Sequence, residues 1–446
     1  MDFLGLHINT GTVESTAFVF GLLLIFGVLG GRVARKFGLP AITGYLVFGI
    51  LLNPQISQKL FNWSLFEPSV WNSAGELVKA GPVEQVEELI IPIALSLIAY
   101  VIGGSLRIDN LKGLGKSVSI VTLTQGLAPF VLVILIVAFA VQPLVGSYLP
   151  DLDFSSYVAM GLVAGAISLA TAPAAVVAVL HELKAKGPLT NTILAVVALD
   201  DALAVICFAI MEGFSWSLLN SGGVSATEMI VHPAVEVLFS LLLGLIFAFI
   251  LIYAMRYLRR QRVQTTLVVL GLVVACGGVA YILDLSIILA NMAFGFVVVN
   301  RMKHSRMIDA VIGIEDIVFV LFFTLAGATF LAGENLNSEI LLAVGVIGVL
   351  IVLARCAGKF GGSWLGAKMA GAPETVRKYL GFSLLPAAGV SIGLALSLEN
   401  KAGFESISQI LVSAIFVVVI ITEIIAPPLV KYGVMKSGEG RLIAHK

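Results

Sequence analysis

Charge is scarce in this chain, because Asp, Glu, Lys and Arg make up only 12% of its 446 residues. A soluble domain usually has about 25% charged residues. The 27 basic residues balance the 27 acidic residues, so no net charge draws the chain to an anionic partner. Together these features exclude a soluble globular enzyme, a disordered chain and a protein that binds nucleic acid.

Cysteine is also rare. The three cysteines, Cys207, Cys276 and Cys356, all lie in apolar stretches. They form neither a disulfide framework nor a metal-binding motif. What the chain has in abundance is apolar sequence, with 59% hydrophobic residues and a mean hydropathy of +1.04. We therefore expect an integral membrane protein.

Long apolar runs recur from one end of the chain to the other. A transmembrane helix needs about 20 mostly apolar residues. With that length as a guide, the sequence predicts an all-α polytopic membrane protein of about 13 transmembrane helices, whose least marked boundary is at Asp284. The expected spans are residues 14–31, 40–52, 88–105, 117–141, 156–180, 190–212, 231–255, 264–282, 285–300, 311–332, 340–366, 377–398 and 407–430.

Lys and Arg alternate between the two sides of these spans. With an external N-terminus, the cytoplasmic loops and the C-terminal tail carry nearly all of them, and the outer side has only Lys59, Lys79 and Lys401. This asymmetry is typical of the positive-inside rule, and an even number of spans would scramble it. The pattern predicts an odd number of spans and a cytoplasmic C-terminus.

Two spans contain helix breakers at mid-membrane. Pro173 lies in the fifth span, and Pro386 and Gly389 lie in the twelfth. Irregular backbone at this depth is tolerated only where it is buried in protein or lines an aqueous cavity. The two spans are seven apart, and an odd shift reverses orientation, so the pair indicates inverted repeats with an ion site at the midplane.

Several ionisable side chains lie within the spans, where each costs free energy unless it is paired or hydrated. Asp200 and Asp201 are central in the sixth span, and neighbours on a helix point about 100° apart. One carboxylate can therefore face a fixed cation while the other faces an aqueous cavity. Arg355 in the eleventh span is the expected counter-ion, and Lys359, one turn nearer the cytoplasm, is either functional or reaches toward the interface.

Two glutamates within the spans have different expected roles. Glu423 lies in the thirteenth span, which the seven-span repeat relates to the helix of Asp200. It is either a hydrogen-bonded structural carboxyl or a second proton group. Glu236 lies near the outer end of the seventh span, where we expect it to be solvated.

A carboxylate at mid-membrane suits cation and proton exchange. Its ionised oxygen is a hard ligand for Na⁺ or Li⁺, whereas its protonated form is neutral and binds no ion. If only the loaded or protonated site can turn to the other side, exchange is obligatory. Other functions remain open: K⁺/H⁺ exchange or K⁺ efflux, an ion channel, and an intramembrane aspartyl protease, which needs carboxylates that converge from different helices.

Four motifs carry a family resemblance. They are the segment 38–46, the segment 171–174 with its Thr-Ala-Pro-Ala sequence, the pair Asp200-Asp201, and the segment 355–358 with its basic-x-x-Gly pattern. In this order and spacing they resemble the monovalent cation:proton antiporter superfamily, in the paired-aspartate branch of bacterial sodium/proton antiporters.

The resemblance implies roles for particular residues. Asp201 would bind the transported Na⁺ or the proton, Asp200 would pair with Arg355 beside that metal ion, and Thr171 would lie near the ion. Ser391, in the second broken span, is a further candidate with Lys359 and Glu423. No cofactor and no enzymatic activity are implied.

The resemblance also implies an architecture. Two broken helices would cross in a core of residues 117–230 and 339–446, which would move elevator-fashion against a dimerisation panel of residues 1–116 and 263–338. Residues 231–262 would link the two. The protein would be a homodimer in the bacterial inner membrane.

One departure from the family pattern bears on stoichiometry. Many paired-aspartate members carry Lys where this chain has Arg355, and Lys can release its proton whereas Arg effectively cannot. The spacing to Gly358 favours Arg355 over Lys359 as the aligned cation. A cycle of two protons per cation is therefore in question.

Overall fold

The computed structural model describes most of the chain, and the statements below concern these residues alone. The described ranges are 2–3, 6–7, 12–37, 39–54, 56–57, 70–71, 77–79, 82–108, 115–220, 226–257, 262–302, 306–330, 338–399, 401 and 403–440.

The described chain is helical except for two short antiparallel strand pairs. Strand β1 (Asp2–Phe3) pairs with β2 (Leu6–His7), and β3 (Val70–Trp71) pairs with β4 (Leu77–Lys79). The helices of the first half are α1 (Thr12–Lys36), α2 (Ala41–Leu51), α4 (Pro82–Ser105), α6 (Gly115–Ile136), α7 (Gln142–Val145), α8 (Phe154–Ile167), α9 (Pro173–Glu182) and α10 (Pro188–Leu219). Those of the second half are α11 (Ala226–Tyr257), α12 (Arg262–Ile282), α13 (Ile287–Arg301), α14 (Arg306–Ala328), α15 (Ser338–Met369), α16 (Glu374–Ser383), α17 (Gly389–Leu396) and α18 (Ser408–Lys436).

Every expected span overlaps a helix. Eight helices are long and apolar enough to cross a membrane, and four shorter apolar helices accompany them. The fifth and twelfth expected spans are each interrupted, between α8 and α9 and between α16 and α17, as their Pro and Gly residues predict. The least marked boundary is real, because α12 ends at Ile282 and Asp284 has a positive φ of 54°. The all-α membrane fold is confirmed, and the number of crossings stays a prediction.

One compact unit comprises Met1–Ala94 and Asp316–Leu336. Within it, α1 packs closely on α2 because Gly30 and Gly44 have no side chains, and a Cβ on either would meet the other's carbonyl. The side chain of Asn53 donates hydrogen bonds to the carbonyls of Ala328 and Phe330, at 3.0 and 2.8 Å. These contacts join segments that are far apart in the sequence.

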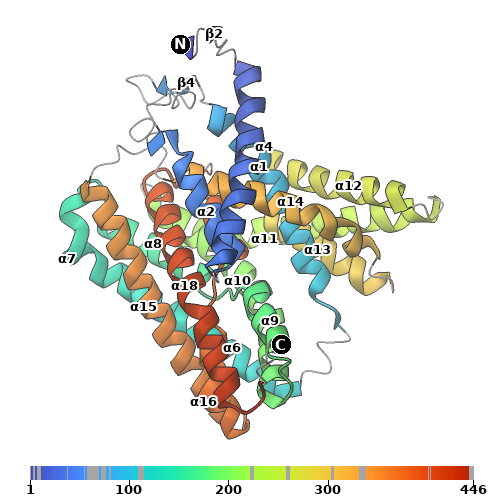
Figure 1. Ribbon diagram of the computed structural model, residues 1–446, viewed down its shortest axis with the longest axis vertical. Helices are drawn as coiled ribbons and strands as arrows, with labels where there is room; N and C mark the ends of the chain where they lie inside the picture. The colour runs from blue at the N-terminus through green and yellow to red at the C-terminus, as the bar shows by residue number, and fades with distance from the viewer. Residues whose placement is uncertain are drawn as a thin grey trace. The chain divides into compact units, whose positions relative to one another are not determined.

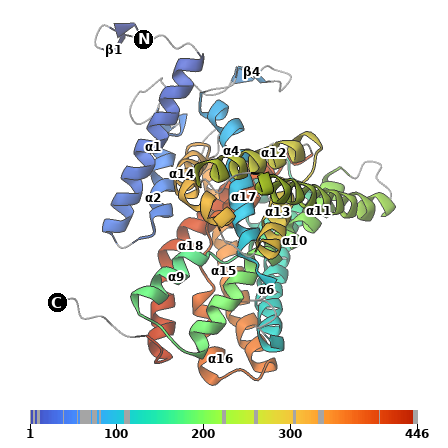
Figure 2. The same ribbon diagram turned by 90° about the vertical axis from the view of Figure 1, so that its right-hand side faces the viewer.

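The second unit comprises Leu95–Glu315 and Asn337–Lys446 and contains both broken spans. Helix α15 packs along α6 through Gly358, Gly362 and Gly366, where an added Cβ would collide with the α6 backbone or with Thr124. Small residues four apart let membrane helices approach closely. In Figure 1, α15 and α18 also lie side by side, in orange and red, and Figure 2 shows α12 lying along α11.

Candidate ion-binding site

The two helix breaks meet each other. Residues 168–172 separate α8 from α9, and residues 384–388 separate α16 from α17. Pro173 occupies the first position of α9, where its missing N–H leaves no hydrogen bond unmade. The backbone N–H of Ala172 donates to the carbonyl of Pro386 at 2.9 Å, which fastens one break to the other.

The guanidinium of Arg355 satisfies the free carbonyls at this meeting point. It donates to Ser168 (3.2 Å), Ala170 (2.5 Å) and Pro386 (3.3 Å), and also to Leu385. Helix C-terminal carbonyls carry partial negative charge and have no partner within their own helix. Arg355 is 1% exposed, so it supplies the positive charge and the donors that buried helix ends require.

Asp200, on α10, is fully buried and has partners on α15, on α6 and in the break between α8 and α9. The ammonium of Lys359 lies 3.3 Å from its Oδ2, and the hydroxyl of Thr171 donates to the same oxygen at 2.6 Å. The amide of Gln125 donates to its Oδ1. Lys359 also donates to Gln125 Oε1 at 2.8 Å, to the Leu169 carbonyl at 2.7 Å and to Thr171 Oγ1 at 3.0 Å. The carboxylate and the ammonium therefore share one polar network.

The expected pairing of Asp200 with Arg355 is wrong in its geometry, because Lys359 is the cation that forms the ion pair. The two basic residues lie four apart on α15, so they share a face and differ in height by about 6 Å. Arg355 lies level with the carbonyls of the two breaks, and Lys359 lies level with Asp200. Lys359 is completely buried and does not reach toward the interface.

Asp201 differs from its neighbour in its partners. Its side chain is buried, with 6% of its surface exposed, and its Oδ1 accepts no hydrogen bond from the residues that the structure describes. A buried carboxylate oxygen without a donor is costly unless it is protonated or binds a cation. Asp200 is thus fully engaged, and Asp201 retains a vacant acceptor.

The remaining candidates have different surroundings. Ser391 lies near the start of α17 and Glu423 lies in α18; both are buried, and the Ser391 hydroxyl and both Glu423 oxygens have no hydrogen-bond partner among the described residues. Glu236 is not solvated as expected, because it is 7% exposed and lies 2.9 Å from Lys401. The ammonium of Lys401 neutralises it and allows its burial.

Gln125 is the member of the Asp200 network that sequence reasoning missed. It is fully buried in α6 and bonds both Asp200 and Lys359. The signal was present, since an amide within an apolar span needs partners. The spacing of Gly358 and Gly362 indicates close helix packing, but the sequence did not identify α6 as the helix that α15 packs against.

The sequence of the chain matches a known protein family. The transmembrane sodium/hydrogen exchanger family matches residues 20–434. The chain is 24% identical over 423 residues to the Na⁺/H⁺-K⁺ antiporter GerN of Bacillus cereus, with 93% of this chain and 95% of GerN covered. It is 23% identical over 426 residues to the high-affinity Na⁺/H⁺ antiporter NhaS3 of Synechocystis, with 90% and 86% covered.

The fold is similar to a solved structure. The sodium proton antiporter MjNhaP1 of Methanocaldococcus jannaschii, solved at pH 8, superposes with a TM-score of 0.68 and 18% identity, covering 96% of this chain and 99% of that one. The match to the family extends across both broken spans and the paired aspartates. The chain is an integral membrane protein that belongs to the sodium/hydrogen exchanger family, within the monovalent cation:proton antiporter superfamily.

Proposed function

We propose that this protein exchanges Na⁺ or Li⁺ for H⁺ and that Asp201 binds either the cation or the proton. The observation that carries the proposal is the contrast between the adjacent aspartates. Asp200 is ion-paired and hydrogen-bonded on both oxygens, whereas the Oδ1 of Asp201 has no donor among the described residues. A titrating site needs a carboxylate whose oxygens are not already occupied.

Competition at one carboxylate provides the coupling. Ionised Asp201 offers a hard oxygen ligand to a small cation, and protonated Asp201 offers a neutral side chain. An empty, ionised Asp201 is the form that a low-dielectric environment penalises most. The helix that carries it therefore moves readily when the site is loaded or protonated, and poorly when it is empty.

The crossing point of the breaks supports a moving body around this site. Arg355 and the bond from Ala172 to Pro386 join both breaks, so α8, α9, α16 and α17 are positioned to move together. We infer an elevator-type motion of residues 117–230 and 339–446 against the panel of residues 1–116 and 263–338. Residues 231–262 link them, in a homodimer with a cytoplasmic C-terminus in the inner membrane.

We infer that Lys359 carries the second proton of the transport cycle. Arginine effectively cannot release its proton, but lysine can. The cation paired with Asp200 is Lys359, so the inability of Arg355 to release a proton does not argue against a two-proton cycle. We infer that exchange of two protons per cation is available to this chain.

The experiment is a proton-flux assay in proteoliposomes with Na⁺, Li⁺ and K⁺ added in turn. Wild-type protein should move protons in response to Na⁺ or Li⁺, and D201N should abolish the response. The matched control is D151N, which removes an exposed carboxylate. Retained exchange in D201N would assign the ion to another group.

Exchange of K⁺ is the second candidate, and one observation favours it. The name of GerN, one of the relatives, includes K⁺ as well as Na⁺. The K⁺ arm of the same assay decides between the two, because a K⁺ response equal to or larger than the Na⁺ response makes this a K⁺/H⁺ antiporter. Repeating each arm with an imposed membrane potential measures whether net charge moves.

A further inference from the structure

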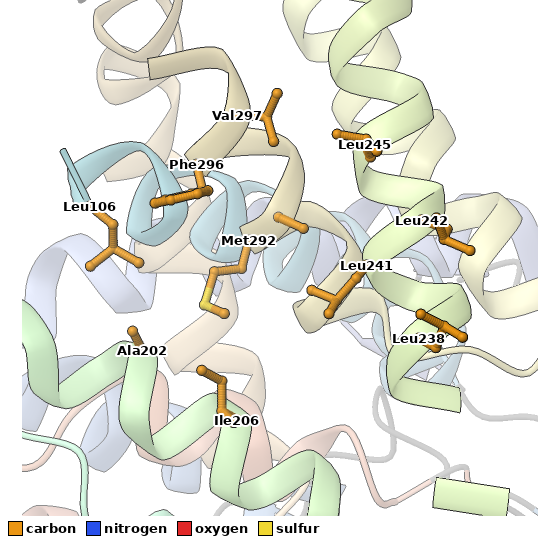
Figure 3. Close-up of a pocket in the computed structure, with 11 residues that line it drawn as sticks. Leu106, Ala202, Ile206, Leu238, Leu241, Leu242, Leu245, Met292, Phe296 and Val297 are labelled. Atoms are coloured by element: carbon orange, nitrogen blue, oxygen red, sulfur yellow. The ribbon is translucent and has the colours of Figure 1, made fainter. Parts of the chain in front are cut away.

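Helix α10, which carries Asp201, meets α11 and α13 along an apolar surface that we call the seam. An apolar cavity of about 410 Å³ opens in the seam. Its lining includes Ala202 and Ile206 from α10, Leu238 and Leu242 from α11, and Met292 and Phe296 from α13 (Figure 3). Apolar contacts between helices are non-directional, and the side chains that line a cavity make fewer of them. The seam around the cavity therefore offers little resistance to sliding.

An ion cluster joins α10 and α11 to the segment between α17 and α18. Lys401, between α17 and α18, lies 2.9 Å from Glu212 of α10 and 2.9 Å from Glu236 of α11. The side chains of the three residues are 19%, 5% and 7% exposed, respectively. Burial alone lowers the pKa of Lys401, but the two carboxylates raise it above the ordinary value, so the ammonium stays charged. These ion pairs are directional and poorly hydrated, unlike the contacts around the cavity.

Lys401 is fastened to the α10 side of the seam. Its backbone N–H donates to the Leu398 carbonyl at 3.2 Å, and its own carbonyl accepts from Phe404 at 3.2 Å. Gly403 follows with a positive φ of 90°, against the side chains of Trp216 and Asn220 at the end of α10. The Lys401–Glu212 pair therefore lies within one body, whereas the Lys401–Glu236 pair crosses the seam.

We infer that Lys401 is a positioning residue for exchange, and that its ion pair with Glu236 is a latch that opens whenever the helix carrying Asp201 moves. This inference rests on the proposed function. Opening the latch leaves Lys401 with Glu212 and deprives Glu236 of its counter-ion. Asp284, in the turn between α12 and α13, adds negative charge near Glu212. The latch thus holds the described conformation and contributes to the barrier to leaving it.

Two substitutions of the same chemistry test the latch because they act in opposite directions. E236Q removes the charge across the seam, so turnover at saturating Na⁺ should rise about threefold or more. E212Q removes one of the two carboxylates that pair with Lys401 and leaves the pair with Glu236 in place, so turnover should fall by a similar factor. The apparent KM for Na⁺ should stay unchanged in both, because neither residue touches Asp201. The control is E374Q, which removes one partner of the exposed Glu374–Lys378 pair.

The outcomes separate the latch from the proposed function. If turnover changes in the same direction in E236Q and E212Q, or is unchanged in both, the latch is overturned. If wild-type protein exchanges no ion, the proposed function fails, and amide hydrogen exchange then decides on the latch. E236Q should reduce protection at the C-terminal end of α10 and around Glu236, and unchanged protection there would overturn the inference.

Discussion

Lys359 and Asp200 form an ion pair in which neither side chain is exposed, with 3.3 Å between Nζ and Oδ2. Thr171 and Gln125 each bond both partners, so the pair is held by donors and acceptors from the break between α8 and α9 and from α6. A buried pair of this kind is tolerable because its remaining hydrogen-bonding positions are filled. Asp201, the next residue, lacks that support on its Oδ1.

Removing the Lys359 ammonium should be costly. K359M leaves Asp200 as a buried carboxylate with two neutral donors, which should destabilise the protein by about 3–5 kcal/mol. K359R keeps the charge but cannot release a proton, so it should retain cation-dependent proton movement and lose its response to membrane potential. Thermal unfolding in detergent and the proteoliposome assay measure the two effects. A K359R variant with the wild-type response to membrane potential would remove Lys359 as carrier of the second proton.

Arg355 should matter for stability more than for ion competition. R355A removes the donor to the buried carbonyls of Ser168, Ala170 and Leu385, at about 1–3 kcal/mol for each group left unsatisfied, whereas the Pro386 carbonyl keeps the Ala172 N–H. R355K restores one positive charge and up to three donors, so it should recover much of the thermal stability. An R355A variant that unfolds at the wild-type temperature would contradict the assignment of Arg355 to the carbonyls of the two breaks.

The close packing of α6 on α15 gives a prediction with an adjacent control. A Cβ at position 362 would collide with the Thr124 carbonyl and the Gln125 Cα, whereas a Cβ at 361 meets nothing within 4 Å. G362A should force the helices apart and lower stability by about 1–3 kcal/mol. G361A should be neutral or stabilising, because alanine is the better helix former. Equal unfolding temperatures of the two variants would show that this contact is not tight.

The capping of α8 by ionised Asp153 should make the stability of the protein depend on pH. Asp153 caps α8, accepting from the Ser156 hydroxyl at 2.7 Å, from the Ser156 N–H at 2.8 Å and from the Ser155 hydroxyl. The bonds from Ser156 and Ser155 hold the pKa of Asp153 below its ordinary value, about 3.9. The stabilisation is therefore fully present above that ordinary value and is lost as the pH falls through the lower folded value.

Substitution should reproduce the loss at neutral pH. D153A should destabilise the protein by about 1 kcal/mol, the usual cost of removing an N-cap. The difference from wild type in thermal unfolding should shrink once the pH is low enough to protonate Asp153 in the folded protein. The control is D151A, an exposed carboxylate two residues earlier. A difference that stays constant down to that pH would contradict the ionised cap.

Features set by local chemistry could be predicted from the sequence. Pro173 and the segment from Pro386 to Gly389 break their helices because proline lacks a donor and glycine is flexible, whatever surrounds them. The adjacent charges of Asp200 and Asp201 marked the polar centre in the same way. Both predictions required only residues that are neighbours in the chain.

Features set by the register between helices could not be predicted. Whether Arg355 or Lys359 reaches Asp200 depends on how α15 is shifted along α10, and a shift of one turn exchanges them. Glu236 seemed solvated because its partner Lys401 is distant in sequence. Gln125 joined the network only through the packing of α6 on α15.

The Arg355 contacts also constrain how the chain is assembled. The carbonyls of Ser168 and Ala170 are satisfied by a residue that the ribosome adds nearly two hundred positions later. Until Arg355 enters the bilayer, a break between α8 and α9 at that depth would be unsatisfied. The nascent N-terminal portion must therefore either hydrate this segment or hold it as continuous helix, and the unwound geometry is acquired only after synthesis of the C-terminal third.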